Sequence, residues 1–250
     1  MDNLRLQFIE FALSANALAF GEFTTKAGRQ SPYFFNAGRF DSGARLAALG
    51  RFYAKTLAAA GRDRGLKFDM LFGPAYKGIT LAAATSIALA ELDADAGRRD
   101  VGFAYNRKEE KAHGEGGVIV GAPLAGRVVI VDDVLTDGAS KRESVELIRA
   151  AGAEPVAVVI ALDRMERKNA EDHLSSGSAV EAFEAEYGIP VLSIANLEDI
   201  MDWLKNETAG AYAQYAGAVA AYRRRYGASH GPIGTGAEAQ ALRYQAVQGA

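Results

Sequence analysis

Two adjacent aspartates, Asp132 and Asp133, follow a run of four aliphatic residues and precede a turn of small and polar residues, TDGAS (136–140). The segment after the turn, KRESVELIRAAGA (141–153), reads as a helix. Backbone N–H groups and the macrodipole at the start of such a helix favour an anion. Two carboxylates suit sugar hydroxyls or a metal ion, and the neighbouring turn suits a phosphate. A ligand that satisfies both the carboxylates and the turn is a phosphorylated sugar.

A second segment, GPAYKGI (73–79), has small residues that let the backbone approach an anion. Lys77 adds a positive charge to it. A strand followed by an ordinary turn would explain the glycines but not the lysine. The segment is therefore a second candidate for binding an anion.

A third segment, NRKEEKAHGEGG (106–117), holds seven ionisable residues and three glycines. Most charged runs are solvated loops, but this one is long for a connection in an α/β sheet, and long loops are often lids. As a lid, it could close over phosphates with four cationic side chains: Arg107, Lys108, Lys111 and His113.

The stretch at residues 21–40 combines Lys26, Arg29 and Arg39 with five aromatic residues. Such a loop would suit a flat anionic ligand, although a surface hairpin explains the same composition equally well. The pair Phe34–Phe35 taken alone is more typical of a hydrophobic core.

The elements that position these residues alternate between strands and helices. Helices between most of the strands indicate a parallel sheet covered on both faces, and such sheets bind ligands at the carboxyl ends of their strands. We expect strands at residues 67–72, 101–105, 127–131, 155–162 and 189–194.

Helix boundaries follow from capping signals. Ser42 is expected to cap a helix that runs to about residue 60, and Asn196 a helix that runs through Leu204. Ser140 and Glu143 form the S-x-x-E pattern of a capping box, which predicts where the helix after the acidic pair begins. Further helices are expected at the N-terminus, after residue 79 up to about residue 92, and at 209–226.

Composition narrows the class of protein. The chain has 250 residues, 49% hydrophobic and 24% charged, which is ample for a buried core. A net charge of −3 argues against nucleic acid as a partner. The absence of cysteine excludes disulfides and fits a reducing compartment. Because no run of 18 apolar residues occurs, no membrane span is expected, and we predict a soluble, cytoplasmic protein.

The four segments together resemble a known family. VVIVDDVLTDGAS (128–140) is similar to the phosphoribosyl pyrophosphate (PRPP) signature of type I phosphoribosyltransferases. FGEFTTKAGRQSPYFFNAGRF (20–40), LFGPAYKGI (71–79) and YNRKEEKAHGEGG (105–117) look like the orotate phosphoribosyltransferase branch. The similarity runs from about residue 7 to residue 226. One residue, Asp137, departs from the family pattern, which usually has a small neutral residue there.

The resemblance implies the α/β type I phosphoribosyltransferase fold, with a mostly parallel central sheet flanked by helices and a small N-terminal hood. It implies a single domain at 1–226, with the hood mainly at about 1–40 and the PRPP-binding core at about 66–195. Residues 227–250 would form a flexible C-terminal tail. It also implies a cis peptide bond before Tyr76.

Residue roles also follow from the resemblance. Lys26, Lys111 and His113 would serve catalysis, the last two by neutralising or protonating the departing pyrophosphate. Phe34, Phe35, Thr136 and Arg164 would bind orotate, although Arg164 alone could be a surface ion pair with Asp163 or Glu166. The residues expected to bind PRPP are Lys26, Tyr76, Lys77, Arg107, Lys108, Lys111, His113, Asp132, Asp133, Val134, Leu135, Thr136, Asp137, Gly138, Ala139 and Ser140.

The implied reaction transfers the 5-phosphoribosyl group from PRPP to N1 of orotate and releases pyrophosphate. Mg²⁺ would be bound through PRPP, not by protein ligands, although direct Mg²⁺ ligation by the acidic pair is an alternative. A homodimer is implied, in which the 106–117 loop acts on the neighbouring subunit. Alternative functions are a phosphoribosyltransferase for another base and a PRPP-sensing regulator.

Overall fold

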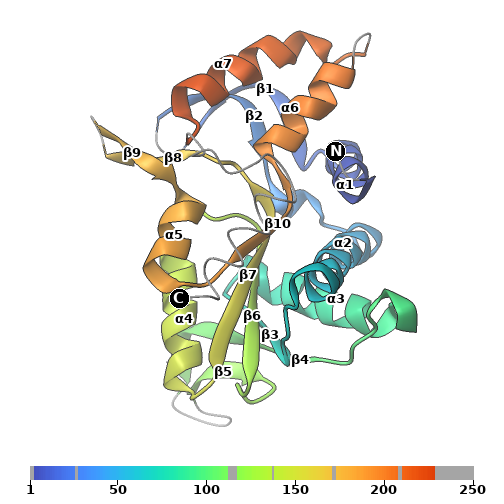
Figure 1. The fold of residues 1–250 in the computed structure, drawn as a ribbon, viewed down its shortest axis with the longest axis vertical. Helices are drawn as coiled ribbons and strands as arrows, with labels where there is room; N and C mark the ends of the chain where they lie inside the picture. Colours follow the sequence, from blue (N-terminus) through green and yellow to red (C-terminus); the bar gives the residue numbers. More distant parts are fainter. Residues whose placement is uncertain are drawn as a thin grey trace.

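A six-stranded sheet with helices on both faces forms the centre of the molecule in a computed structural model of the chain (Figure 1). The structure describes residues 3–25, 28–111, 117–136, 138–170, 173–207 and 210–228, and only the backbone at 109–111, 168–170 and 173–176. The strand order is β10-β7-β6-β3-β4-β5, and every pair is parallel except β4 and β5. The strands are β3 (Met70–Gly73), β4 (Gly102–Lys111), β5 (Gly117–Gly121), β6 (Arg127–Asp132), β7 (Glu154–Asp163) and β10 (Val191–Asn196).

The aliphatic run in β6 is buried on both sides of the sheet, which explains why it does not alternate with polar residues. Val129 and Val131 face the core shared with helices α2 (Gly43–Arg64) and α3 (Lys77–Glu91). Val128 and Ile130 face the core shared with α4 (Ala139–Ala150) and α5 (Ala179–Tyr187). The predicted α/β fold with a mostly parallel sheet is therefore confirmed.

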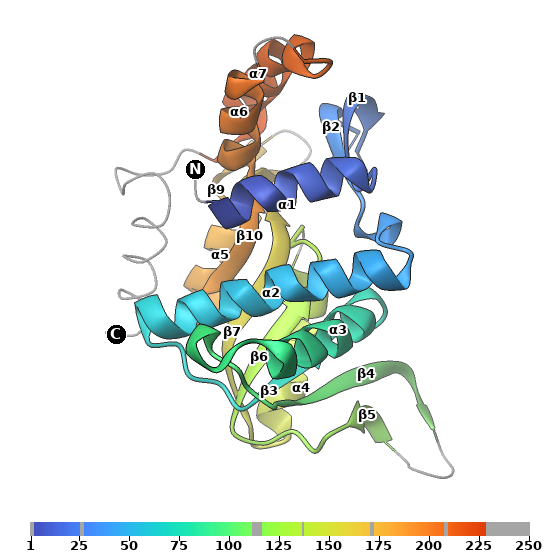
Figure 2. The ribbon, with the colours of Figure 1, turned by 90° about the vertical axis from the view of Figure 1, so that its right-hand side faces the viewer.

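A second group of elements lies beyond the carboxyl ends of the strands (Figures 1 and 2). Helix α1, the β1–β2 hairpin and the helices α6 and α7 gather there, and the short β8–β9 hairpin follows β7 directly. An ion pair of 2.9 Å between Arg5 and Asp199 joins α1 to α6. The bounds are α1 (Asn3–Ser14), β1 (Leu18–Thr24), β2 (Gln30–Phe35), β8 (Arg167–Ala170), β9 (His173–Ser178), α6 (Leu197–Asn206) and α7 (Ala216–Tyr226).

Most element predictions are confirmed, including the helices capped by Ser42 and Asn196. The capping box at Ser140 is wrong. Helix α4 begins at Ala139, and its N-cap is Gly138 in the left-handed conformation. Ser140 therefore lies inside the first turn, and Glu143 is left to bind a neighbouring strand instead of capping the helix.

Three boundaries also differ from the prediction. The charged segment is not all loop, because β4 continues to Lys111 and pairs with β5 in an edge hairpin (Figure 2). An edge hairpin exposed to solvent accepts charged residues at little desolvation cost. The last helix starts only at Ala216, after a short turn of 3-10 helix. Gly227 and Ala228, assigned to the tail, belong to the fold: Gly227 pairs with Glu166, and Ala228 is buried.

No helix within the described part of the chain is long and apolar enough to cross a membrane.

Candidate active site

The turns that follow β3, β6 and β7 lie side by side at the carboxyl ends of these strands, because the strands are neighbours and parallel. We call this end of the sheet the carboxyl edge. Each turn carries a residue singled out by its chemistry: Lys77 after β3, Asp133 after β6 and Arg164 after β7. The backbone carbonyl of Asp133 accepts a hydrogen bond of 2.9 Å from the Ala161 N–H in β7, which fixes the second turn against the third strand.

Each carboxylate of the acidic pair is buried and has a lysine partner. Asp132 and Asp133 are each 7% exposed. The ammonium group of Lys141 binds the Asp132 carboxylate, and that of Lys77 lies 2.7 Å from the Asp133 carboxylate. Burial raises the pKa of Asp132, while the charge of Lys141 acts in the opposite direction. The two lysines therefore offset much of the cost of burying two adjacent negative charges.

Lys141 was missed by the sequence analysis. Its side chain is 6% exposed, and its ammonium also donates to the Val134 carbonyl at 2.6 Å. The spacing of residues along the helix could have indicated its burial, because Lys141 stands four residues before Val145 and seven before Ile148, both buried. That spacing places the lysine on the inward face of α4. A lysine on a buried face needs a carboxylate, and Asp132 is the one at hand.

The turn after β6 presents the start of helix α4 at the carboxyl edge. Gly138 has a φ of 77°, a conformation that glycine adopts without strain. No acidic residue occurs in the first turn of α4, so its N–H groups and dipole remain favourable to an anion. Thr136 is exposed beside it, whereas Leu135 is buried. Asp137 lies outside the described residues.

The turn after β3 packs closely against the acidic pair. A Cβ atom on Gly78 would come within 2.9 Å of the Val131 carbonyl oxygen, so only glycine allows this approach. The peptide bond between Ala75 and Tyr76 is cis, as the resemblance implied. Tyr76 is 73% exposed, and the Lys77 side chain is 54% exposed. Both side chains are thus accessible to a ligand at this edge.

The charged segment is tied to helix α4 at its base. Glu143 accepts a hydrogen bond from the Asn106 side-chain amide at 3.3 Å and lies 3.5 Å from the Lys108 ammonium. The side-chain oxygen Oδ1 of Asn106 in turn accepts a hydrogen bond of 2.9 Å from the Ala75 N–H. Asn106 therefore links the turn after β3 to the helix after β6. Arg107 lies beside it on β4.

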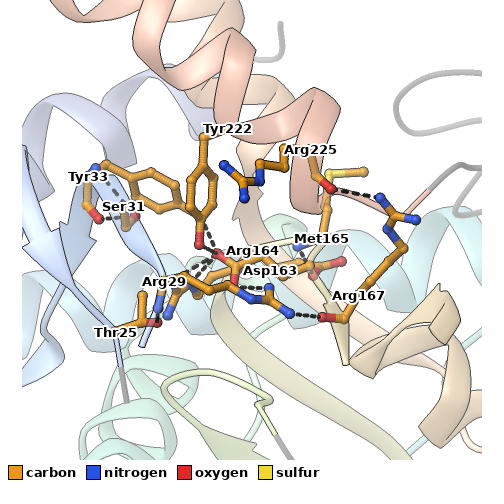
Figure 3. A network of polar contacts seen from close by, with 11 residues as sticks. Thr25, Arg29, Ser31, Tyr33, Asp163, Arg164, Met165, Arg167, Tyr222 and Arg225 are labelled. Atoms are coloured by element: carbon orange, nitrogen blue, oxygen red, sulfur yellow. Dashed lines mark hydrogen bonds and ion pairs between the residues drawn. The ribbon is translucent and has the colours of Figure 1, made fainter. Parts of the chain in front are cut away.

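Arg164 stands at the end of β7, where Figure 3 shows it among side chains from several segments. Its guanidinium lies 2.7 Å from the Glu166 carboxylate, so the ion pair considered from the sequence is present. The guanidinium carbon also lies 5.6 Å from the centre of the Tyr33 ring. Arg164 is partly buried by these contacts and still reaches the surface, at 22% side-chain exposure.

The two phenylalanines of β2 point in opposite directions, as neighbouring residues of a strand do. Phe34 is 44% exposed and stacks on Phe23 with ring centres 5.4 Å apart. Phe35 packs against the hydrophobic core, with its ring centre 6.4 Å from those of Phe8 and Phe40. Only the Phe34 ring is therefore placed to stack on a ligand.

Several predicted site residues lie outside the described part. Lys26, His113 and Asp137 are not described, and Lys111 is described only as the last backbone position of β4. Their roles stay predictions. The structure brings together the acidic pair, Lys77, the start of α4 and the base of the charged segment. It places Arg164 one strand away.

Known proteins share both the sequence and the fold. The phosphoribosyl transferase domain matches residues 41–190. The orotate phosphoribosyltransferase of Herminiimonas arsenicoxydans is 60% identical over 228 residues, which are 91% of this chain and 99% of that protein. Its counterpart from Ralstonia pickettii (strain 12J) is 60% identical over 226 residues, 90% of this chain and 96% of that one.

Among solved structures, the crystal structure of orotate phosphoribosyltransferase from Francisella tularensis has a TM-score of 0.73 at 41% identity. The match covers 88% of this chain and 99% of that one. The chain therefore belongs to the phosphoribosyltransferase family and, within it, to the orotate phosphoribosyltransferases, which transfer the phosphoribosyl group of PRPP to orotate in pyrimidine biosynthesis.

Proposed function

We propose that the transfer takes place at the carboxyl edge of the sheet, with PRPP bound between the turns after β3 and β6. The observation that carries the proposal is the junction of three features there: a buried acidic pair, an accessible lysine and a helix whose first turn holds no acidic residue. The 5′-phosphate is assigned to the start of α4, around residues 136–140. Asp132 and Asp133 are assigned to the ribose hydroxyls.

Lys77 is the residue we expect to change partners during the reaction. In the structure its ammonium lies 2.7 Å from the Asp133 carboxylate. A diphosphate beside the turn after β3 offers more negative charge than one carboxylate, and the exposed lysine stem can turn toward it. Tyr76 and the backbone of residues 74–77 complete the proposed pyrophosphate site.

Orotate is assigned to the space next to the end of β7. Its carboxylate would pair with Arg164, since a guanidinium fork matches a planar carboxylate, and its ring would stack on Phe34. Phe35 would contribute its backbone only, because its partly buried side chain packs against the core. Thr136 is exposed on the neighbouring turn and completes the proposed set.

The chemistry needs a stabilised leaving group, exact positioning and exclusion of water. Displacement at the anomeric carbon passes through an oxocarbenium-like state. Lys26, Lys77, Arg107 and Lys111 are assigned to the negative charge of the departing pyrophosphate, and His113 to its neutralisation or protonation. Orotate N1 is already anionic, so the proposal includes no protein base.

Mg²⁺ is proposed to arrive on PRPP, where it would neutralise charge on the diphosphate. The residues present fit a metal brought by the substrate. Both carboxylates of the acidic pair are engaged by lysines, and among the described residues no three His, Cys, Asp or Glu side chains lie close enough together to hold a metal. Diphosphate and ribose oxygens would therefore be the main ligands.

The proposal includes a homodimer in which the 106–117 segment of one subunit closes over the site of the other. It also includes a cytoplasmic enzyme, which suits a chain without cysteine. Residues 1–226, extended by Gly227 and Ala228, would act as one domain, with the β1–β2 hairpin forming a hood over the acceptor site.

The activity is tested by mixing the protein with orotate, PRPP and Mg²⁺ and following the loss of orotate absorbance. Turnover is expected. Retained PRPP binding without turnover would contradict the proposal and favour a PRPP-sensing regulator.

The shared site is tested with two inactive variants, Lys26→Ala and Lys111→Ala. Mixed dimers should regain part of the activity, because one of their two sites keeps both lysines. Mixed dimers that stay inactive would show that the segment does not act on the neighbouring subunit.

A further inference from the structure

Glu166 joins segments far apart in the sequence through a network of polar contacts. Figure 3 shows its partners Arg29, Tyr33 and Tyr222 around Arg164. Glu166 Oε1 accepts hydrogen bonds from the Tyr33 and Tyr222 hydroxyls, both at 3.2 Å, and from Arg164 Nε at 3.0 Å. Its Oε2 lies 3.6 Å from an Arg29 nitrogen. These partners come from β2, from α7, from the turn after β7 and from the segment before β2.

The carboxylate is held firmly by these contacts. Its side chain is 17% exposed, and the backbone carbonyl of Glu166 accepts from the Ala179 N–H at 3.3 Å. Burial, and then the charge of Glu166, raise the pKa of Tyr33 well above its usual value, so this hydroxyl keeps its proton and remains a donor. A carboxylate with partners on several sides is a fixed part of the fold, in contrast to an exposed side chain that swings freely.

The way in which Glu166 binds Arg164 leaves part of the guanidinium for another anion. Glu166 Oε1 contacts Nε at 3.0 Å and Nη2 at 2.7 Å, which form one edge of the guanidinium. The third nitrogen, Nη1, takes part in neither contact with Glu166, and the Tyr33 hydroxyl is a further polar partner of the guanidinium. Arginine has five N–H donors in a rigid plane, so a guanidinium held at one edge can still offer the adjacent edge to a second carboxylate.

The charges around Glu166 also favour a second carboxylate. Arg29 and Arg164 both lie near its single negative charge. Burial disfavours the charged form of Arg164, but the oxygens of Tyr33 and Glu166 raise its pKa above the ordinary arginine value. The guanidinium therefore stays charged, which favours the approach of a second carboxylate.

We propose that Glu166 is a positioning residue for the acceptor substrate: it holds one edge of the Arg164 guanidinium so that the adjacent edge faces the orotate carboxylate. This inference rests on the proposed role of Arg164. The alternative is that Glu166 occupies the place of the substrate carboxylate and must be displaced. The firm attachment of Glu166 to Tyr33 and Tyr222 argues against displacement.

Glu166→Gln tests the inference, because glutamine keeps the shape and one acceptor oxygen but removes the charge. We expect the KM for orotate to rise about tenfold, the loss typical of a charge-assisted hydrogen bond, and the KM for PRPP to change less than about twofold. Inhibition by uracil, which lacks the carboxylate, should be unchanged. A fall in the orotate KM would support displacement, and an unchanged KM would refute positioning.

The matched control is Glu198→Gln. Glu198 forms an ion pair of 3.4 Å with Arg223 in the same part of the fold but has no contact with Arg164. This variant should leave both KM values unchanged. If Glu166→Gln does not fold, Tyr222→Phe takes its place, because it removes one donor to Glu166 and leaves the carboxylate. It should raise the orotate KM about two- to threefold, and no change would count against positioning.

A double-mutant cycle with Arg164→Ala separates the role of Glu166 from the role of Arg164. Once Arg164 is absent, Glu166→Gln should have no further effect on orotate affinity. A full effect in that background would show that Glu166 acts independently of Arg164 and would overturn the inference. If Arg164→Ala itself leaves orotate affinity unchanged, the proposed role of Arg164 fails instead.

Discussion

Replacement of the buried Lys141 by methionine should strongly destabilise the enzyme. Methionine has nearly the same length and fills the same space, so the main loss is the positive charge. The side chains of Lys141 and Asp132 are 6% and 10% exposed. Removal of one partner of a buried ion pair costs about 3–5 kcal/mol, because the other charge stays buried and unpaired. For a chain of this size that corresponds to a Tm lower by about 6–20 °C.

The stability lost in Lys141→Met should increase as the pH rises. Burial already raises the pKa of Asp132, and Lys141 works against that rise. Without Lys141 the pKa of Asp132 in the folded state should move further above its unfolded value. Between these two pKa values the folded protein binds more protons than the unfolded protein does, so its free energy of unfolding falls as the pH rises. The variant should therefore lose most stability at pH 8 and less at pH 5.

The measurement is urea unfolding of wild type and variant at both pH values. The exposed lysine of the Lys205–Asp202 pair provides the control, and Lys205→Met should change the free energy of unfolding by less than about 0.5 kcal/mol. Asp132→Asn combined with Lys141→Met should recover most of the loss, since neither charge is then buried alone. A cost for Lys141→Met below about 1 kcal/mol at pH 8 would contradict the assigned pairing.

Two other predictions concern packing. Gly50→Ala should destabilise the protein by about 1–3 kcal/mol in urea unfolding, because the new Cβ would lie 2.5 Å from the Ala84 carbonyl oxygen between α2 and α3. Gly43→Ala in the same helix, with nothing within 4 Å, is the control and should not destabilise. Phe35→Ala should cost about 3 kcal/mol of stability, whereas Phe34→Ala should cost less than about 1 kcal/mol and mainly raise the KM for orotate. Equal effects of the two phenylalanine variants on stability would refute their opposite orientations.

The central sheet could be predicted from the sequence because its signals are local. The run at 128–131 lacks alternation, and the structure buries those residues on both faces of the sheet. Two element predictions were wrong, one because two local signals competed and one because the signal was weak. The S-x-x-E pattern at Ser140 was a sound capping signal, but Gly138 started the helix two residues earlier. The charged segment was read as a loop because strand pairing at an exposed edge leaves little trace in hydrophobic periodicity.

The part of the site that we assign to PRPP was also predictable from the sequence, since its acidic pair, turn and helix start are contiguous in the chain. What the sequence analysis missed were the partners that make the pair tolerable inside the protein. Lys141 is only nine residues from Asp132, but its ion pair with Asp132 depends on helix α4, which turns the lysine toward the core. Lys77 was assigned to the ligand from its sequence, and its contact with Asp133 spans 56 residues.

The acceptor part of the site could not have been assembled from local patterns. Glu166 meets Tyr33 across 133 residues and Tyr222 across 56, and Tyr222 stands in none of the four segments that resemble the family. The two halves of the active site thus differ in how the chain encodes them. The residues that we assign to PRPP lie mostly in short contiguous segments of the chain. The geometry of Arg164, which we assign to the choice of acceptor, depends on contacts among the N-terminal hairpin, β7 and α7. A substitution in α7, far from the PRPP turn in the sequence, should therefore alter orotate affinity while leaving PRPP binding intact.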